Sequence, residues 1–257
     1  MDRDVLKDEQ WERIALLLPG KVGDPGRSAS NNRLFMEAIL HVVRTGGPWR
    51  DLPDRFGNWN SNFQRFRRWA KKAVFDRVFA ALSGDPDFEY AMVDGTIIRV
   101  HQHGTGAKGG PQDQAIGRSR GGLTTKILAL VDALGNLVRF VLLPGHRHDV
   151  KGVKDLIADV PFKMLLADKA FDVDWLRENL EGRGVAAVIP PKANRKRHIP
   201  CDFAAYKWRH LVENFFCSLK AFRRIGTRYD KTDTSFRACL TCLSCYRLGS
   251  GGGSWRC

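Results

Sequence analysis

The chain has 257 residues and carries 42 Lys and Arg against 28 Asp and Glu, which gives a formal net charge of +14. An excess of this size favours nucleic acid as partner, because each phosphate that a cation neutralises releases counterions. No apolar run reaches the roughly 18 residues of a membrane-spanning helix, and the charged start MDRDVLKDEQWERI is unlike a secretory signal. We therefore expect a cytoplasmic protein that does not bind membranes.

The N-terminal part of the chain is predicted to be helical. Apolar residues recur at helical spacing over residues 1–18, 32–44 and 60–82. The third helix carries five cations on one side: Arg65, Arg67, Arg68, Lys71 and Lys72. Helices in this order with a basic face are typical of a helix-turn-helix-like DNA-binding domain, which we place at residues 1–85. The alternative is a helical domain whose solvated surface is basic.

The pattern then changes to short β-rich runs. One strand is predicted over residues 88–100 and a hairpin over 122–143, with a Gly-rich basic loop between them that we expect to lie over a ligand. Helix, strand, helix and strand follow as far as residue 190, and a last helix begins at Tyr206. This order is typical of an RNase H-like mixed α/β sheet with flanking helices, which we place at residues 86–248.

Three carboxylates occupy informative places in these elements. Asp94 lies inside an apolar strand, where an acid is costly unless it is paired or coordinates a cation. Asp168 ends a buried strand, at the edge where open α/β sheets bind ligands, and Glu213 lies on the last helix. In an RNase H-like sheet they would converge, and their hard oxygen donors would favour Mg2+ or Mn2+. The simpler alternatives are a turn, a helix cap and a surface position, respectively.

The predicted helix over residues 206–220 gathers functional side chains on one face. At about 100° per residue, four of them fall within a stripe of roughly 60°: Tyr206, Arg209, Glu213 and Lys220. Apolar residues occupy the opposite face, as in any amphipathic helix that packs on a core. The stripe is informative only together with the two upstream aspartates.

These motifs resemble those of the DDE transposases of bacterial insertion sequences, in particular the insertion-sequence-5 group. The four residues of the stripe match the family signature Tyr-x2-Arg-x3-Glu-x6-Lys without a gap. Asp94-Gly95 and the segment ADKAFD around Asp168 resemble the two aspartate motifs, and PWRDLPDRFGNW resembles the N-terminal segment. The resemblance covers residues 5 to about 248, and the carboxylates are too close in sequence for the β-rich insertion domain of some relatives.

The resemblance implies a metal-dependent transposase. Such an enzyme cuts DNA at the terminal inverted repeats of its element and joins the exposed 3′-hydroxyl to target DNA. Asp94, Asp168 and Glu213 would be catalytic and would bind two Mg2+ or Mn2+ ions. The enzyme would be bacterial, nucleoid-associated and a homodimer, because two element ends must be brought together.

The resemblance also implies contacts with DNA. Arg209 would pair with phosphates through a bidentate fork and Lys220 as a point charge. Tyr206 would hydrogen-bond or stack near the cut end. A basic segment just before the last helix would hold the DNA backbone nearby, unless it is only a solvated loop: Arg195, Lys196, Arg197 and His198.

Six cysteines are present, and their uneven placement does not resemble a secreted disulfide framework. Three of them form a C-x2-C-x2-C run that superficially suggests a metal site: Cys239, Cys242 and Cys245. Because this spacing also lines one face of a helix, we favour small core residues in a final packing helix. The last nine residues, GSGGGSWRC, read as a flexible linker-like tail where the family helix would continue.

Two other functions stay open on the sequence. One is a DNA-binding regulator that has lost the chemistry, and the other is an RNase H-like nuclease that cuts without joining. The intact acidic residues argue against the first, and inverted repeats beside the coding sequence would distinguish the second. A further cluster, His146, His148 and Asp149, could ligate Zn2+, but we expect it to orient the site or contact DNA.

Overall fold

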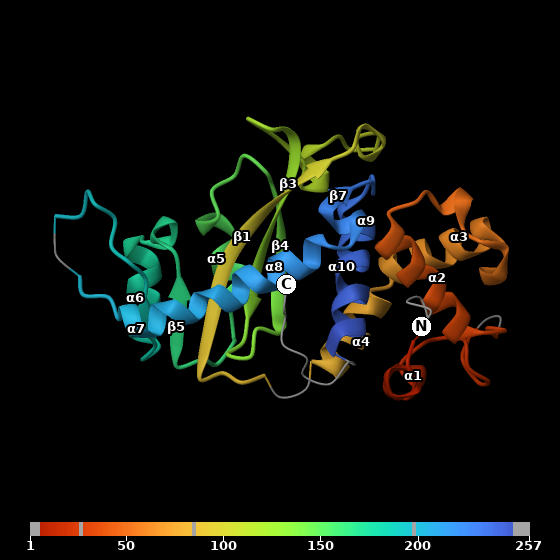
Figure 1. The fold of residues 1–257 in the computed structure, drawn as a ribbon, viewed down its shortest axis with the longest axis horizontal. Helices are drawn as coiled ribbons and strands as arrows, with labels where there is room; N and C mark the ends of the chain where they lie inside the picture. The colour runs from red at the N-terminus through yellow and green to blue at the C-terminus, as the bar shows by residue number, and fades with distance from the viewer. Residues whose placement is uncertain (1–5, 26–27, 84–85, 197–198, 249–257) are drawn as a thin grey trace. The chain divides into compact units, whose positions relative to one another are not determined.

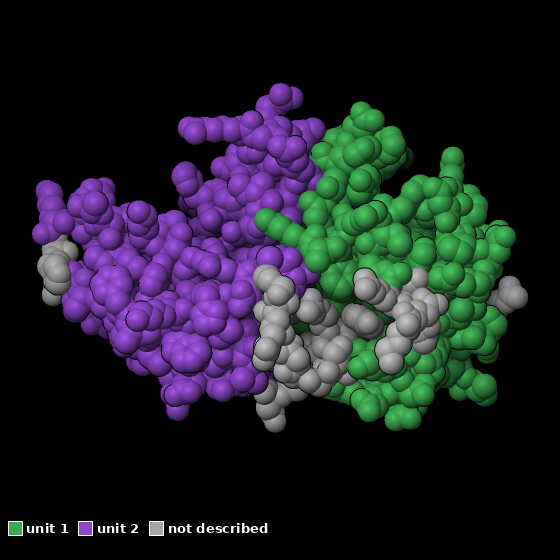
Figure 2. All heavy atoms as spheres, viewed as in Figure 1, with its two compact units in different colours: residues 1–84, 100–114, 220–253 green, residues 85–99, 115–219, 254–257 purple. Residues whose placement is uncertain are grey.

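The structure is a computed structural model, and it describes residues 6–25, 28–83, 86–196 and 199–248. The chain forms two compact units, shown in different colours in Figure 2. The first contains residues 1–84, 100–114 and 220–253, and the second contains residues 85–99, 115–219 and 254–257. The N-terminal unit therefore also takes in C-terminal residues that we had expected in the sheet domain. The predicted tail after residue 248 lies outside the described residues.

The first unit is mostly helical, as the N-terminal sequence predicts. Its elements are α1 (Asp8–Ala15), α2 (Asn32–Thr45), η1 (Trp49–Asp51), η2 (Asp54–Phe56), α3 (Trp59–Lys71), α4 (Val74–Leu82), η3 (Gln102–Gly104), η4 (Gln112–Gln114), α9 (Arg223–Gly226), β7 (Thr227–Arg228) and α10 (Asp233–Leu248), where η marks a 3-10 helix. The last helix packs against α2, α3 and α4 (Figure 1). The predicted final packing helix therefore packs among the N-terminal helices.

The single helix predicted over residues 60–82 is two helices in the structure. The break lies at Ala73, whose φ of 50° and ψ of 35° are left-handed. The turn lets Phe75 pack against Phe66 and Trp69, with ring centroids 5.6 and 5.9 Å away. Alanine favours helix continuation, so the local sequence does not predict this break. Tertiary packing stabilises it.

The second unit is built on a mixed sheet. Its elements are β1 (Tyr90–Val100), β2 (Gly117–Ser119), β3 (Gly122–Val131), β4 (Leu137–Pro144), α5 (Val150–Ile157), β5 (Met164–Ala167), η5 (Lys169–Phe171), α6 (Asp174–Gly182), β6 (Ala186–Val188), α7 (Phe203–Tyr206), η6 (Lys207–Arg209) and α8 (His210–Lys220). The strands from β4 to β6 lie in the order β4-β3-β1-β5-β6, with β2 also paired to β3. The β1, β3 and β4 strands pair antiparallel, whereas β5 and β6 run parallel to β1. The predicted RNase H-like mixed sheet with flanking helices is confirmed.

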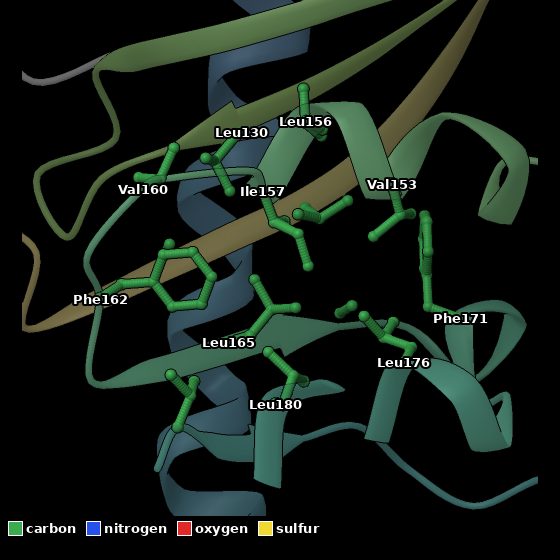
Figure 3. Close-up of a cluster of buried hydrophobic side chains, with 14 of the residues drawn as sticks. Leu130, Val153, Leu156, Ile157, Val160, Phe162, Leu165, Phe171, Leu176 and Leu180 are labelled. Carbon is green, nitrogen blue, oxygen red and sulfur yellow. The ribbon is translucent and has the colours of Figure 1, made fainter. Parts of the chain in front are cut away.

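The core of this unit lies between the sheet and two helices. Side chains of α5 and α6, such as Leu156 and Leu176, pack with Leu130 of β3 and Leu165 of β5 (Figure 3). Each of these four side chains is almost completely buried, which contributes roughly 2 kcal/mol per leucine. The α8 helix runs across the other side of β1 (Figures 1 and 3). The polar residues of α8 are thereby placed close to the middle of β1.

The predicted helix over residues 206–220 is helical throughout but not uniform. It begins with α7, whose first turn Asp202 caps by accepting hydrogen bonds from two backbone N–H groups. The tighter η6 turn then separates α7 from α8. A 3-10 turn advances about 120° per residue rather than 100°, so the stripe expected for a uniform α-helix is displaced at its start. In the described part of the chain, no helix combines the length and apolar character needed to cross a membrane.

Candidate active site

Two of the three expected carboxylates lie on neighbouring strands. In the parallel pair of β1 and β5, Val93 is opposite Ala167, so Asp94 and Asp168 are the next residues along. Burial raises the pKa of Asp94 above its usual value, and the nearby negative charge of Asp168 adds to this increase. The hydrogen bond from Gly95 and the charge of Arg209 oppose it. The sheet register thus places the two aspartates together, as the sequence predicts.

Each aspartate also makes a local hydrogen bond to the backbone. Asp94 Oδ1 accepts from the Gly95 N–H at 2.8 Å, and Asp168 Oδ1 accepts from the Ala170 N–H at 2.8 Å. The second bond caps the η5 turn. Asp168 therefore caps this 3-10 turn rather than the helix α6 that follows, and the cap is compatible with a functional role. These bonds fix the direction of each carboxylate.

Arg209 joins Asp94 to Glu213. Its Nη1 lies 2.8 Å from Asp94 Oδ2, and its Nη2 pairs with Glu213 Oε1 one helical turn away. The Arg209 and Asp94 side chains are only 16% and 19% exposed, whereas Glu213 is 55% exposed. Burial would lower the pKa of Arg209, but the charge of Asp94 and their hydrogen bond outweigh it and raise that pKa. Tyr206 also belongs here, with its ring centroid 5.8 Å from the Arg209 Cζ.

The three carboxylates are not arranged as a finished metal site. Among the described residues, no three His, Cys, Asp or Glu side chains are grouped so that they could hold an ion. Two of the expected ligands, Asp94 and Glu213, are instead bound to the same guanidinium. A positive group between two carboxylates shows that this position suits a cation, and the oxygen donors suit Mg2+ or Mn2+. The chemistry of these donors therefore fits the expected metal, while their arrangement in this structure accommodates the Arg209 guanidinium.

The remaining signature residue is Lys220, which ends α8 and is exposed. It falls in the first unit, whereas the other three signature residues fall in the second with the two aspartates. The four residues of the predicted stripe are therefore divided between the units.

The basic segment before α7 is only partly available for DNA. Arg195 is held in two ion pairs, 2.6 Å from Asp172 Oδ2 and 2.7 Å from Asp174 Oδ1. Lys196 is exposed. Arg197 and His198 lie outside the described residues. Of this segment, Lys196 is the described cation that best fits a contact with phosphate.

The basic helix of the first unit also has one cation that is used in packing and others that are exposed. Arg65 is half-buried, donates a hydrogen bond to Asn32 and lies over the rings of Phe35 and Trp69 at 4.2 and 4.7 Å. Burial lowers its pKa. The other four cations of this group are exposed: Arg67, Arg68, Lys71 and Lys72. Packing accounts for Arg65, and the other four remain candidates for DNA contact.

Asp149 lies behind the first aspartate motif. A Cβ added to Gly95 would lie 3.1 Å from Asp149 Oδ2, a tight contact, so the carboxylate rests against this glycine. Asp149 pairs with Lys126, whose Nζ also donates to the Arg147 carbonyl at 2.7 Å. The contact places Asp149 against the first aspartate motif, and the orienting or DNA-contacting role of His146, His148 and Asp149 stays a prediction. The sequence does not identify Lys126, because a single lysine in a strand carries no distinctive signal.

The cysteine run is buried in α10. Cys239, Cys242 and Cys245 are at most 4% exposed, in agreement with the predicted packing role. Burial raises the pKa of Cys242 to about 12 and raises the other two well above the usual value. Thiols held neutral in this way are inert core residues.

Comparison with known proteins supports the resemblance drawn from the motifs. A family model described as "Transposase DDE domain" matches residues 89–248, and one described as "Putative transposase of IS4/5 family" matches residues 6–79. The "Uncharacterized protein y4sN" of Sinorhizobium fredii is 44% identical over 118 residues, which cover 45% of this chain and 94% of that protein. The "Putative transposase for insertion sequence element IS6501" of Brucella ovis is 37% identical over 120 residues, which cover 44% of this chain and 89% of that protein. Among solved structures, the piggyBac transposase synaptic complex with hairpin DNA is similar at 14% identity and a TM-score of 0.49, covering 99% of this chain and 74% of that chain.

Proposed function

The chain belongs to the transposase DDE domain family, and from this premise we propose that it cuts and joins DNA at the terminal inverted repeats of an insertion sequence. The observation that carries the proposal is the contact of Arg209 with Asp94 and Glu213, beside Asp168. Arg209 and Glu213 belong to the family signature, and Asp94 and Asp168 belong to the aspartate motifs. The reaction class is phosphoryl transfer, first to water and then to the 3′-hydroxyl of the cut strand.

Asp94, Asp168 and Glu213 would hold two Mg2+ or Mn2+ ions. Divalent cations there would stabilise the attacking and leaving oxygens of an in-line displacement at phosphorus. The local hydrogen bonds of the two aspartates hold their carboxylates in fixed directions before any ion binds. Glu213 is the most exposed of the three and the freest to adjust.

Arg209 would serve two states of the site. Without metal, its guanidinium neutralises Asp94 and Glu213, which stabilises carboxylates that would otherwise repel one another. With divalent ions on the carboxylates, the planar fork of Arg209 would be free for bidentate pairing with a DNA phosphate. Tyr206 beneath it would stack or hydrogen-bond near the cut end.

The partner would be double-stranded DNA, both the element ends and the target. The net charge of +14 and the exposed cations of α3 support this part of the proposal. A paired-end complex would need two copies of the chain, and we therefore propose a homodimer in the active complex. Lys220 would contribute a further phosphate contact.

The test is incubation of the full chain with a duplex of the element's own end and Mg2+. We expect the wild type to cut at the end of the repeat and then to join the end to a target plasmid. Asp94→Asn and Glu213→Gln should bind the duplex and leave it whole, whereas Asp155→Asn and Glu178→Gln remove the same charges from exposed positions and should keep activity. If the wild type binds without cutting, the chain is a regulator. If it cuts and never joins, it is a nuclease.

A further inference from the structure

The carboxylate of Asp172 is completely buried and is held by three donors. Its Oδ1 lies 2.7 Å from Arg177 Nε, and its Oδ2 lies 2.6 Å from Arg195 Nε and 2.8 Å from the Lys192 backbone N. The side chain is 0% exposed. Burial alone would raise the pKa of Asp172, but the hydrogen bonds from these three donors outweigh it and hold the pKa well below its usual range. The buried carboxylate is therefore ionised at neutral pH.

The same network fixes a segment that has little structure of its own. Between Val188 and Phe203, the described residues form no helix or strand. Arg177 donates to the Ile189 carbonyl at 2.7 Å, Asp172 binds the Lys192 backbone, and Arg195 completes the series. Residues 189–195 are thus attached at three points to the start of α6.

Asp172 is also attached to the candidate active site through one turn. Asp168 caps the start of η5, and its carbonyl accepts from the Phe171 N–H at 3.1 Å. The Asp172 N–H donates to the Lys169 carbonyl at 3.2 Å. Phe171 is 1% exposed and anchors the turn in the core. Two aspartates therefore flank one rigid turn, one beside Asp94 and the other holding the basic segment.

We propose that Asp172 is a positioning residue that holds the basic segment beside the candidate active site, so that Lys196 presents its charge to the DNA backbone. The inference rests on the proposed function for the identity of the partner. Arg195, which the sequence offered as a DNA contact, acts inside the protein as the link between Asp172 and Asp174. A buried ion network contributes little net stability compared with apolar packing, so its benefit is the geometry that it fixes.

The proposal makes a prediction opposite to that of simple electrostatics. Asp172→Asn removes a negative charge from a DNA-binding protein, which by itself should strengthen binding. Loss of positioning should instead weaken it. Glu178→Gln is the matched control, because it removes the same charge from an exposed side chain of α6 that has no place in this network. We expect the control to bind DNA as the wild type does or slightly tighter.

The measurement is the affinity of the full chain for a random-sequence DNA duplex as a function of salt. Contacts with the DNA backbone depend neither on the DNA sequence nor on the cleavage reaction. Weakened binding to random-sequence DNA can therefore be distinguished from loss of cleavage at the element end. Lys196→Gln should weaken binding about fivefold and reduce the salt slope by about 1, the size of one lost phosphate contact. Asp172→Asn should give a similar loss, and the double variant should be no weaker than either single variant.

Three results would overturn the proposal. They are unchanged or tighter binding by Asp172→Asn, an equal loss in Glu178→Gln, and losses in the double variant that simply multiply. If Asp172→Asn does not fold, as judged by circular dichroism, Arg195→Gln takes its place, because it leaves Asp172 with two of its donors. It should weaken binding in the same direction, again without adding to Lys196→Gln. Additive loss in that pair would equally refute positioning.

Discussion

Replacing Arg209 by Gln separates its structural role from its proposed role in catalysis. Among the described residues, this guanidinium pairs with both Asp94 and Glu213. Removing it leaves two carboxylates without their cation in a partly buried place. The metal-free protein should become less stable, and the same change should make the site more attractive to a divalent cation. Stability and metal binding therefore move in opposite directions.

The size of the stability loss follows from the exposures. Removing one partner of a fully buried ion pair costs about 3–5 kcal/mol, whereas an exposed pair contributes about 0–1 kcal/mol. The pair with Asp94 is mostly buried and the pair with Glu213 is half open to solvent. We therefore expect a loss of about 1–3 kcal/mol, which corresponds to a decrease in Tm of roughly 3–10 °C for a protein of this size.

The assay is thermal unfolding with EDTA and then with increasing Mg2+ or Mn2+, supported by calorimetric titration of Mn2+. Loss of the competing charge should tighten metal binding about tenfold, so that saturating metal stabilises Arg209→Gln by about 1.4 kcal/mol more than the wild type. Lys207→Gln is the matched control, because it removes the same charge at an exposed neighbouring position. It should change neither quantity appreciably.

The reasoning is refuted if Arg209→Gln binds Mn2+ no more tightly than the wild type. That outcome would mean that Arg209 orients the carboxylates for metal rather than competing with it. An unchanged Tm in EDTA would show instead that the two ion pairs do not form in solution.

Three other predictions concern separate parts of the chain. Arg65→Ala should lower stability by about 1–2 kcal/mol, because the side chain loses its stacking and its burial. Arg68 is exposed, so Arg68→Ala should leave the Tm unchanged and weaken DNA binding. Calorimetry and a DNA-binding titration distinguish the two variants. Because the pKa of Asp172 is lowered in the folded state, its contribution to stability is present above the unfolded value of about 3.9 and is lost as pH falls below it. The Tm difference between wild type and Asp172→Asn should thus be largest near neutral pH and shrink below about pH 4, and a constant difference would refute this. Iodoacetamide at pH 8 should label exposed Cys217 in the native protein and spare buried Cys242, as peptide mass spectrometry would show, and equal labelling would contradict the buried position.

The sheet and its carboxylates were predictable because their signals are local. A strand such as Tyr90–Val100 has a largely apolar pattern with Asp94 near its middle, and Asp168 follows directly on a buried run. Element order then determined which strands are neighbours. Arg209 and Glu213 are a turn apart, so helical spacing alone placed them together.

The features that escaped prediction depend on contacts distant in sequence. The break at Ala73 has no Gly or Pro to announce it and results from aromatic packing. The destination of α10 among the N-terminal helices depends on which apolar faces are complementary, which no local pattern reveals. Asp172 looks like an ordinary turn aspartate until Arg195 folds back on it across 23 residues.

The central claim, that Asp94 binds a catalytic metal, is tested most directly by Asp94→Cys in the cleavage assay. Thiolate is a poor ligand for Mg2+ and a better one for Mn2+, which lies higher in the order of affinity for softer donors. We predict that Asp94→Cys is inactive on element-end DNA with Mg2+ and regains cleavage with Mn2+, while Asp94→Ala stays inactive with both. Cleavage by Asp94→Cys in Mg2+ at the wild-type rate, or no recovery in Mn2+ by a folded variant that binds DNA, would contradict the account.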